Sequence, residues 1–140
     1  MKALSLWQPW ASLMADSRKK IETRHWRPPL WLLNQPVAIH AAMKVDAYAC
    51  EDFGYDRNMI PRGQVVCIGA FYKWEKFDEL YKQWMMERWL NSGDEEGNYG
   101  DFSAGRYGWF FRLTEKLNPP IPAKGHQGIW NWECVEASER

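Results

Sequence analysis

The first 26 residues carry a strand, a turn, a helix and a second strand in quick succession, so the chain is built from short elements. Residues 3–6 are apolar and predict a short strand. Pro9 then favours the start of a helix ending near residue 18, because proline is well tolerated in a first helical turn. In residues 20–24, charged side chains alternate with apolar or β-branched ones, which is typical of a strand. The charged face of that strand, which favours a polar pocket over a core, carries Lys20, Glu22 and Arg24.

The rest of the chain continues in short elements separated by proline and glycine. Residues 64–71 give the strongest strand pattern. The other predictions are strands at 37–42, 106–114 and 128–133, a short helix or loop at 45–55, a helix at 78–90, a mobile loop or lid at 91–105 and an extended connector at 118–122. This order matches neither an alternating βαβ series nor a helical bundle. We therefore expect an α+β fold: a small five- or six-stranded β-barrel, closed or partly open, with short covering helices.

Length and composition limit the class of protein. With 140 residues, 46% of them apolar, we expect one domain over residues 1–140 with a core of its own. No apolar run approaches the ~18 residues of a membrane span, and the N-terminus lacks the long apolar segment of a signal peptide. Cys50, Cys67 and Cys134 are odd in number and lack C-x-x-C spacing, which argues against a disulfide framework and a zinc site. We expect reduced thiols, a cytoplasmic protein, no metal and no cofactor.

The charges are unevenly distributed, although the net charge is zero. Residues 1–44 contain seven Lys and Arg against two acidic residues, a net charge of +5, so residues 45–140 carry −5. This asymmetry permits one basic face on a neutral molecule, which would suit a nucleic-acid partner. Chance variation over short segments explains it equally well.

Ten tryptophans are more than one binding site can use, so most of them must be structural. Aromatic rings fill protein cores and also stack on nucleobases. We expect core or edge packing for Trp84 and Trp89 in the helix and for Trp130 and Trp132 in the last strand. The inward face of the helix would also carry Leu80 and Leu90. The alternating residues Tyr107, Trp109 and Phe111 are expected in the core.

Several segments together resemble one known family. They read LSLWQPWASLM at residues 4–14, K-x-I-E-x-R at 19–24, IHAAMK at 39–44, GRYGWF at 105–110 and KGHQGIWNW at 124–132. The chain is similar in these segments to the ASCH (ASC-1 homology) domain, which belongs to the PUA-like superfamily of small β-barrels. The resemblance covers nearly the whole chain, with residues 72–104 least matched. The chain departs from the family in the run Asp16-Ser17-Arg18, since many members carry glycine just before the motif lysine.

The resemblance implies a cleft between barrel and helices, and the partners expected there are RNA, single-stranded nucleic acid or a nucleoside. Some relatives hydrolyse the acyl group of N4-acetylcytidine, and others are reported to cut RNA or to bind nucleic acid. The amidohydrolase branch pairs a lysine, at the position of Lys19, with a threonine at the position of Glu22 and with a later glutamate. Glu75 is one candidate for that glutamate.

Three candidate residues of this cleft have clear structural alternatives. Lys19 would contact a phosphate or act as base or nucleophile; its alternative is a solvated lysine at a helix end. Glu22 would be a general base or accept hydrogen bonds from a nucleobase; its alternative is an ion pair with Arg24 or Lys20. His40 lies in an apolar strand, where a satisfied core histidine is more common than a catalyst.

The remaining candidates would hold the ligand. Trp7 and Gln8 would stack on a base and read it, although a core lid is nearly as plausible for Trp7. Further candidates are Trp26 for stacking, Arg24 and Lys44 for phosphate binding, and Arg106 and Tyr107 as a lining after the flexible loop. The alternative for Arg106 is a surface arginine stacked on an aromatic ring.

Two functions of different class follow. The first is a binding module for a nucleobase or a single-stranded segment, which needs only stacking and a few basic groups. The second is a hydrolase acting on a modified nucleoside or on RNA, an amidohydrolase or ribonuclease with Lys19 and Glu22 as an acid/base pair. Binding ranks first, because no third catalytic group can be placed from the sequence.

Overall fold

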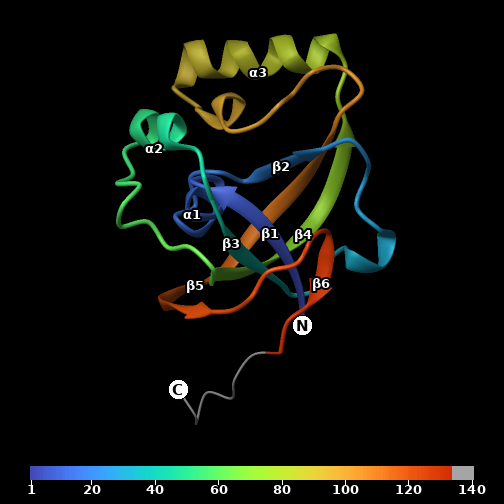
Figure 1. Cartoon of the computed structure of the whole chain (residues 1–140). Helices are drawn as coiled ribbons and strands as arrows, with labels where there is room; N and C mark the ends of the chain where they lie inside the picture. The colour runs from blue at the N-terminus through green and yellow to red at the C-terminus, as the bar shows by residue number, and fades with distance from the viewer. Residues whose placement is uncertain (134–140) are drawn as a thin grey trace.

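A computed structural model describes residues 1–133 and shows a six-stranded mixed sheet with three α-helices (Figure 1). The sheet order is β2-β5-β4-β3-β1-β6; β1 and β3 are parallel and the other neighbours antiparallel. The strands are β1 Lys2–Gln8, β2 Ile21–Arg24, β3 Val37–Val45, β4 Gln64–Lys76, β5 Tyr107–Pro122 and β6 Ile129–Asn131. The helices are α1 Trp10–Ala15, α2 Ala47–Phe53 and α3 Glu79–Ser92, with 3₁₀ turns at Leu30–Leu32 and Glu96–Asn98.

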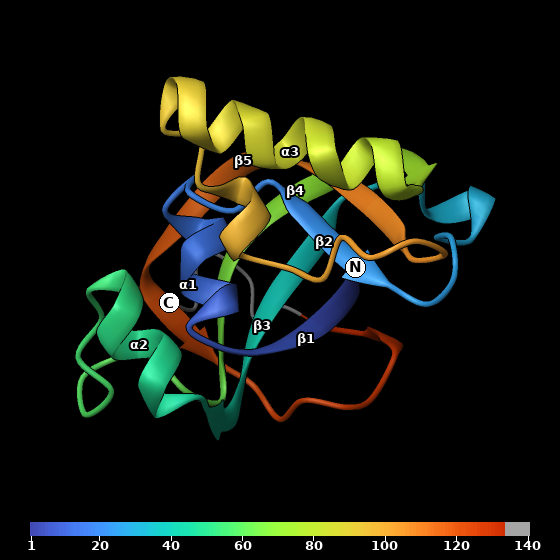
Figure 2. The same ribbon diagram turned by 90° about the horizontal axis from the view of Figure 1, so that it is seen from above.

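The α+β class is confirmed, but the sheet does not close into a barrel. It curls so that α1 lies inside the curve (Figure 2). Within residues 1–133, no ladder joins β2 to β1 or β6. The short β6 pairs with β1 only over Lys2–Leu4, so from Ser5 onward that edge of β1 is unpaired. An open seam therefore remains between β1 and β2.

The main core lies between α1 and the concave side of the sheet. Residues 11–15 of α1 are all buried, and this face packs on β1, β3, β4 and β5. Trp109 and Phe111 are buried there beside Phe71, with ring centroids 5.5 and 5.2 Å from that of Phe71. Tyr107 is partly buried against the same core, so the alternation predicted on this strand is confirmed. Trp130 and Trp132 are buried in a second cluster, as expected.

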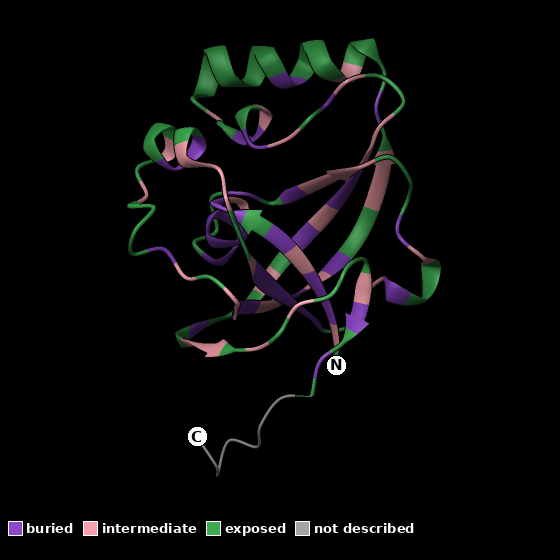
Figure 3. Ribbon diagram, in the orientation of Figure 1, coloured by how far each residue is buried: buried purple, intermediate pink, exposed green. Residues whose placement is uncertain are grey.

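Helix α3 faces the core in a way that the sequence pattern did not predict. Leu80, Trp84 and Leu90 were expected to point inward, but they are 74%, 47% and 71% exposed, and Trp89 is 46% exposed. Only Met85 of this helix is buried, in a small cluster with residues that include Phe77 (Figure 3). A single small cluster beneath the helix leaves most of its circumference to solvent.

Two other predictions about local structure were wrong. Residues 118–122 belong to the long β5 and are not a separate connector, because their backbone pairs with β4 up to Pro122. The segment 91–105 is not a free loop, because Glu96, Tyr99 and Phe102 are buried. The turn after α1 forms without glycine, with Ser17 in the left-handed region at φ 58°.

Cys50 and Cys67 are both free and buried, and Cys67 lies in the main core. Cys134 lies outside the described residues.

Gly69 tests the tight packing of β4 on β5. A Cβ atom there would lie 2.3 Å from Cζ of Phe111 and 2.4 Å from the carbonyl oxygen of Arg112. We expect Gly69→Ala to lower the free energy of unfolding by about 1–3 kcal/mol, since overpacking shifts backbone and side chains. Urea unfolding measures the change. Gly97→Ala is the matched control, because a Cβ there meets nothing within 4 Å; equal midpoints for both variants would contradict this packing.

Candidate functional site

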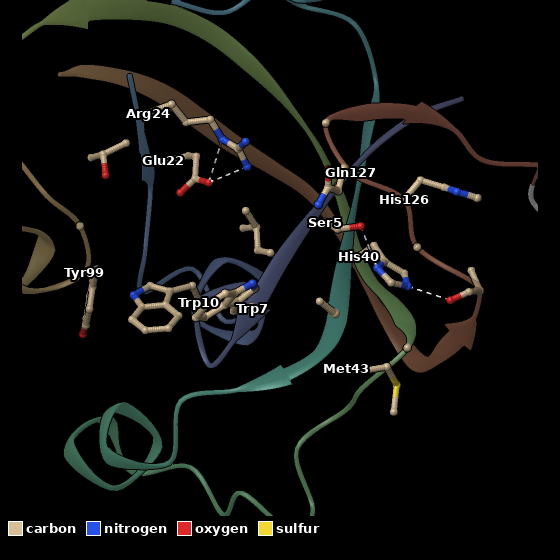
Figure 4. A pocket seen from close by; sticks show the side chains of 18 of the residues that line it. Ser5, Trp7, Trp10, Glu22, Arg24, His40, Met43, Tyr99, His126 and Gln127 are labelled. Atoms are coloured by element: carbon tan, nitrogen blue, oxygen red, sulfur yellow. Dashed lines mark hydrogen bonds and ion pairs between the residues drawn. The ribbon is translucent and has the colours of Figure 1, made fainter. Parts of the chain in front are cut away.

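The open seam between β1 and β2 forms a cleft with a volume of about 1760 Å³. One wall is made by residues 22–24 of β2 with residues 98–101 and Arg106. The opposite wall is made by residues 5–7 of β1, part of β3 and the loop 122–128. Figure 4 shows Glu22 and Arg24 on one side, with Ser5, His40 and Gln127 across the cleft from them.

Glu22 and Arg24 form an ion pair on the β2 wall. Arg24 donates from Nε and Nη2 to the same oxygen, Oε2 of Glu22, at 3.3 and 3.2 Å. The guanidinium carbon of Arg24 lies over the Trp109 ring, 5.6 Å from the ring centroid, in a cation–π contact. Oε1 of Glu22 has no hydrogen bond among the described residues and lies 3.8 Å from Nζ of Lys19. The pair therefore leaves one carboxylate oxygen as an acceptor in the cleft wall.

Lys19 is buried behind this wall, with 1% of its surface exposed. Its ammonium group donates to the carbonyl oxygens of Ile21 at 2.5 Å and Tyr99 at 2.7 Å. Burial lowers the pKa of Lys19, while the charges of Glu22 and Glu96 act in the opposite direction. The lysine thus joins β2 to the segment that forms the rest of the wall.

Three further contacts hold the 94–106 segment against β2. Glu96 accepts a hydrogen bond from the backbone N–H of Lys20 at 2.6 Å, and its Oε2 is buried without a hydrogen-bond partner among residues 1–133. Burial raises the pKa of the Glu96 carboxyl group. The Asp101 N–H donates to Oγ1 of Thr23 at 3.1 Å, and Arg106 donates to the Thr23 carbonyl oxygen at 3.1 Å. This wall is fixed in place by hydrogen bonds and is not a free lid.

His40 lies in the opposite wall and is almost fully buried, with both ring nitrogens engaged. Nε2 lies 2.7 Å from the Ala123 carbonyl oxygen, which can only accept, so Nε2 carries the proton. Nδ1 then accepts from the Ser5 hydroxyl at 3.0 Å, and Ser5 in turn accepts from the indole N–H of Trp130 at 3.0 Å. Burial lowers the pKa of His40, which favours this neutral form.

The loop 122–128 packs closely on this histidine. A Cβ atom on Gly125 would lie 2.4 Å from Cε1 of His40 and 2.9 Å from Oγ of Ser5. The close approach needs a glycine, and it holds Gln127 and His126 at the edge of the cleft.

Two tryptophans of the cleft stand in solvent. Trp7 is 50% exposed and Trp26 is 61% exposed, whereas Trp10 is partly buried beside Trp7. Lys44 covers one face of the Trp7 ring, with Nζ 4.0 Å from the ring centroid. The Trp26 backbone is held by a 2.8 Å hydrogen bond from the indole N–H of Trp109. Both rings are therefore exposed and are not part of the core, and the backbone of Trp26 is anchored to Trp109.

A model of the ASCH domain family matches residues 4–139. The chain belongs to the ASCH domain family. Among solved structures it is similar to an ASCH protein from Zymomonas mobilis, with 19% identity and a TM-score of 0.54, covering 99% of this chain and 89% of that one. Two mutants of that protein give TM-scores of 0.50 at 20% identity, covering 86% of this chain and 74% and 72% of theirs. At these identities the likeness shows the fold alone. A search of curated proteins gave no match.

Among the ten candidate residues of this ASCH domain, six line the cleft. They are Trp7, Glu22, Arg24, Trp26, His40 and Arg106. Lys44 stands at the rim through its contact with Trp7. Tyr107 packs on the core and on Trp74 instead of lining the cleft.

Gln8 and Lys19 are placed differently from what the sequence led us to expect. Gln8 is fully buried, and its amide is bonded to Ser12 and to the Pro61 carbonyl oxygen, so it is not free to read a base. Lys19 is neither a solvated helix-end lysine nor part of the cleft lining. Lys20 precedes β2 and does not share the cleft face of Glu22.

The structure also adds residues that the sequence analysis missed. Lys124, Gln127 and Asp101 line the cleft, and none of them lies in a periodic pattern. Glu75, the candidate for a later glutamate, pairs with Lys73 outside the cleft. The glutamate beside Lys19 is Glu96, which lies in a Gly- and Asp-rich segment where burial has no sequence signal.

Within residues 1–133, no group of three or more His, Cys, Asp or Glu side chains is arranged to hold a metal ion. None of the helices found there is long and apolar enough to cross a membrane.

Replacement of Lys19 tests its role in joining β2 to the 94–106 segment. Lys19→Met leaves two buried carbonyl groups and nearby carboxylates without their cation, so we expect a loss of about 3–5 kcal/mol in the free energy of unfolding. Lys20→Met is the control, since this exposed side chain should change stability by less than about 0.5 kcal/mol. Urea unfolding of both variants measures the difference; a Lys19→Met protein as stable as the control would contradict the role.

The buried His40 predicts a pH dependence of stability. Because its pKa is lower in the folded state, the unfolded chain binds more protons just below the ordinary histidine pKa. Stability from this group therefore falls as the pH drops from about 7 towards 5. The raised pKa of Glu96 changes stability with pH in the opposite direction. The contribution of His40 is therefore isolated by comparing wild type with a His40 variant.

We expect His40→Gln to remove the histidine contribution and His25→Gln, at an exposed site that does not influence the pKa of His40, to retain it. Urea unfolding at pH 7 and pH 5 gives the two differences. Equal pH dependence in wild type and His40→Gln would show that His40 is not held neutral.

Proposed function

We propose that the cleft of this ASCH domain binds nucleobases of single-stranded nucleic acid, RNA above all. The observation that carries the proposal is the pair of solvent-exposed indoles, Trp7 and Trp26, in one cleft with Arg24 and Arg106. Exposed aromatic rings give up water readily to a base, and stacking accepts every base because each has a π face. The ASCH family is generally thought to bind RNA, which agrees with this choice.

The polar groups of the cleft suit a base in the same position. Oε1 of Glu22 accepts N–H groups, and Arg24 and Arg106 donate to ring nitrogens, carbonyl oxygens or phosphate. Glu22 and Arg24 support each other, so the base edge would meet a preformed acceptor and donor. The base would stack on an indole ring, and its polar edge would exchange hydrogen bonds to water for hydrogen bonds to these side chains.

Replacement of the two indoles tests the proposal. We expect Trp7→Ala and Trp26→Ala each to weaken binding of a fluorescein-labelled single-stranded RNA by about 5- to 150-fold, since one base stack contributes ~1–3 kcal/mol. Trp89→Ala is the matched control, because Trp89 is 46% exposed on α3 and lies outside the cleft. Fluorescence polarisation gives the three dissociation constants. Unchanged affinity for both cleft variants, or an equal loss for the control, would overturn the proposal.

Salt provides a separate test of the electrostatic part. Each phosphate contact with single-stranded nucleic acid releases counterions, so the affinity should fall with a slope of about −0.7 per contact in a plot of log K against log salt. Binding that stays constant from low to high salt would remove phosphate contacts from the proposal.

One observation favours a second function, hydrolysis of an N4-acylated cytidine or of RNA. Glu22 stands in the cleft between two cations, and Lys19 beside it has a lowered pKa. In this proposal Glu22 is the general base. The amine of Lys19 donates to two carbonyl groups, so Lys19 does not contact the substrate and influences Glu22 only through its charge. Incubation with N4-acetylcytidine and with RNA, using wild type, Glu22→Gln and Lys19→Met, tests it. Turnover that survives Glu22→Gln would exclude this assignment.

A further inference from the structure

The two walls of the cleft differ in charge. Both acidic residues of the lining, Glu22 and Asp101, belong to the β2 wall, and each is paired there: Glu22 with Arg24 at 3.2 Å and Asp101 with Arg106 at 3.5 Å. The lining of the opposite wall, from β1, β3 and the loop 122–128, contains no acidic residue. The charges of the β2 wall are thus internally balanced.

The cations of the opposite wall are not balanced in this way. Lys124 lines the cleft and Lys44 stands at its rim, and neither forms an ion pair within residues 1–133. The acidic residue near Lys44 in the chain, Asp46, uses its carboxylate to cap α2 through the N–H of Ala49. His40 is neutral, and Gln127 adds hydrogen-bond capacity without charge. This wall therefore presents two ammonium groups that no residue within 1–133 neutralises.

A neutral nucleoside carries no negative charge that would neutralise these cations. A phosphate does, and Lys44 places an ammonium group 4.0 Å from the centre of the Trp7 ring, on which a base would stack. The volume, about 1760 Å³, also exceeds the roughly 300–1000 Å³ of sites for single small molecules. Volume and charge both indicate a ligand larger than a nucleoside that carries negative charge on one side.

We propose that the cleft discriminates by phosphate: its ligands are nucleotides or RNA strands, oriented with a base against the paired charges of the β2 wall and with phosphate groups on Lys44 or Lys124. This proposal rests on the proposed binding function and specifies its ligand class. It makes Lys44 and Lys124 the residues that determine the choice of ligand.

The test compares the four ribonucleosides, their 5′-monophosphates and the dinucleotide CpC by isothermal titration at low salt. For wild type we expect at least tenfold tighter binding of the monophosphates than of the nucleosides, and tighter binding again of CpC than of cytidine. The double variant Lys44→Gln/Lys124→Gln should lose most of the preference for phosphate, measured as the ratio of nucleotide affinity to nucleoside affinity. Arg57→Gln/Lys82→Gln, which removes the same charge from exposed positions outside the cleft, should retain the preference.

Equal affinity of wild type for nucleosides and nucleotides would overturn this proposal, as would a phosphate preference that survives Lys44→Gln/Lys124→Gln. If the nucleosides bind in a Trp7-dependent way under those outcomes, the proposed function stands and only the phosphate discrimination fails. If neither nucleosides, nucleotides nor RNA bind, the proposed function and this proposal both fail.

Discussion

The cleft depends on a single buried ammonium group, that of Lys19. Removing a charge from water is costly, and the charge persists only where hydrogen bonds and opposite charges replace the water. Here the carbonyl groups of Ile21 and Tyr99 accept its hydrogen bonds, and Glu22 lies 3.8 Å away. These partners come from β2 and from the 94–106 segment, which are distant in sequence. The lysine therefore fixes the two parts of one cleft wall relative to each other.

The second determinant is a sheet that curls without closing. A closed barrel would pair β1 with β2 and leave no space between them, whereas the short β6 covers only the first residues of β1. The edge of β2 at the seam is occupied by side chains: Lys19 and Arg106 donate to the carbonyl oxygens of Ile21 and Thr23. Edge strands that are capped in this way resist pairing with another strand. The seam therefore remains open, and the wall formed by β2 presents side chains in place of its backbone.

The sequence predicted those parts of the fold where periodicity and burial coincide. The alternation at Tyr107, Trp109 and Phe111 led to the right core face, and Glu22 and Arg24 were correctly assigned to one polar face. The prediction failed where burial depends on partners far away in the chain. The alternation of side chains along β2 does not extend to Lys19, which precedes the strand. The spacing of Leu80 and Leu90 on α3 could not show that only a small cluster lies beneath the helix. Glu96 lacked any local signal, because its partners, the charge of Lys19 and the backbone N–H of Lys20, lie far away in the chain.

We propose that nucleic acid binds at the seam between β1 and β2. The indole N–H signals of the ten tryptophans in a ¹H–¹⁵N spectrum test it most directly, each assigned by replacing one tryptophan with phenylalanine. On titration with a short single-stranded RNA, we expect the Trp7, Trp10 and Trp26 signals to shift, whereas those of Trp84 and Trp89 on α3 stay in place. Shifts confined to the α3 tryptophans would contradict it, as would a spectrum that does not change.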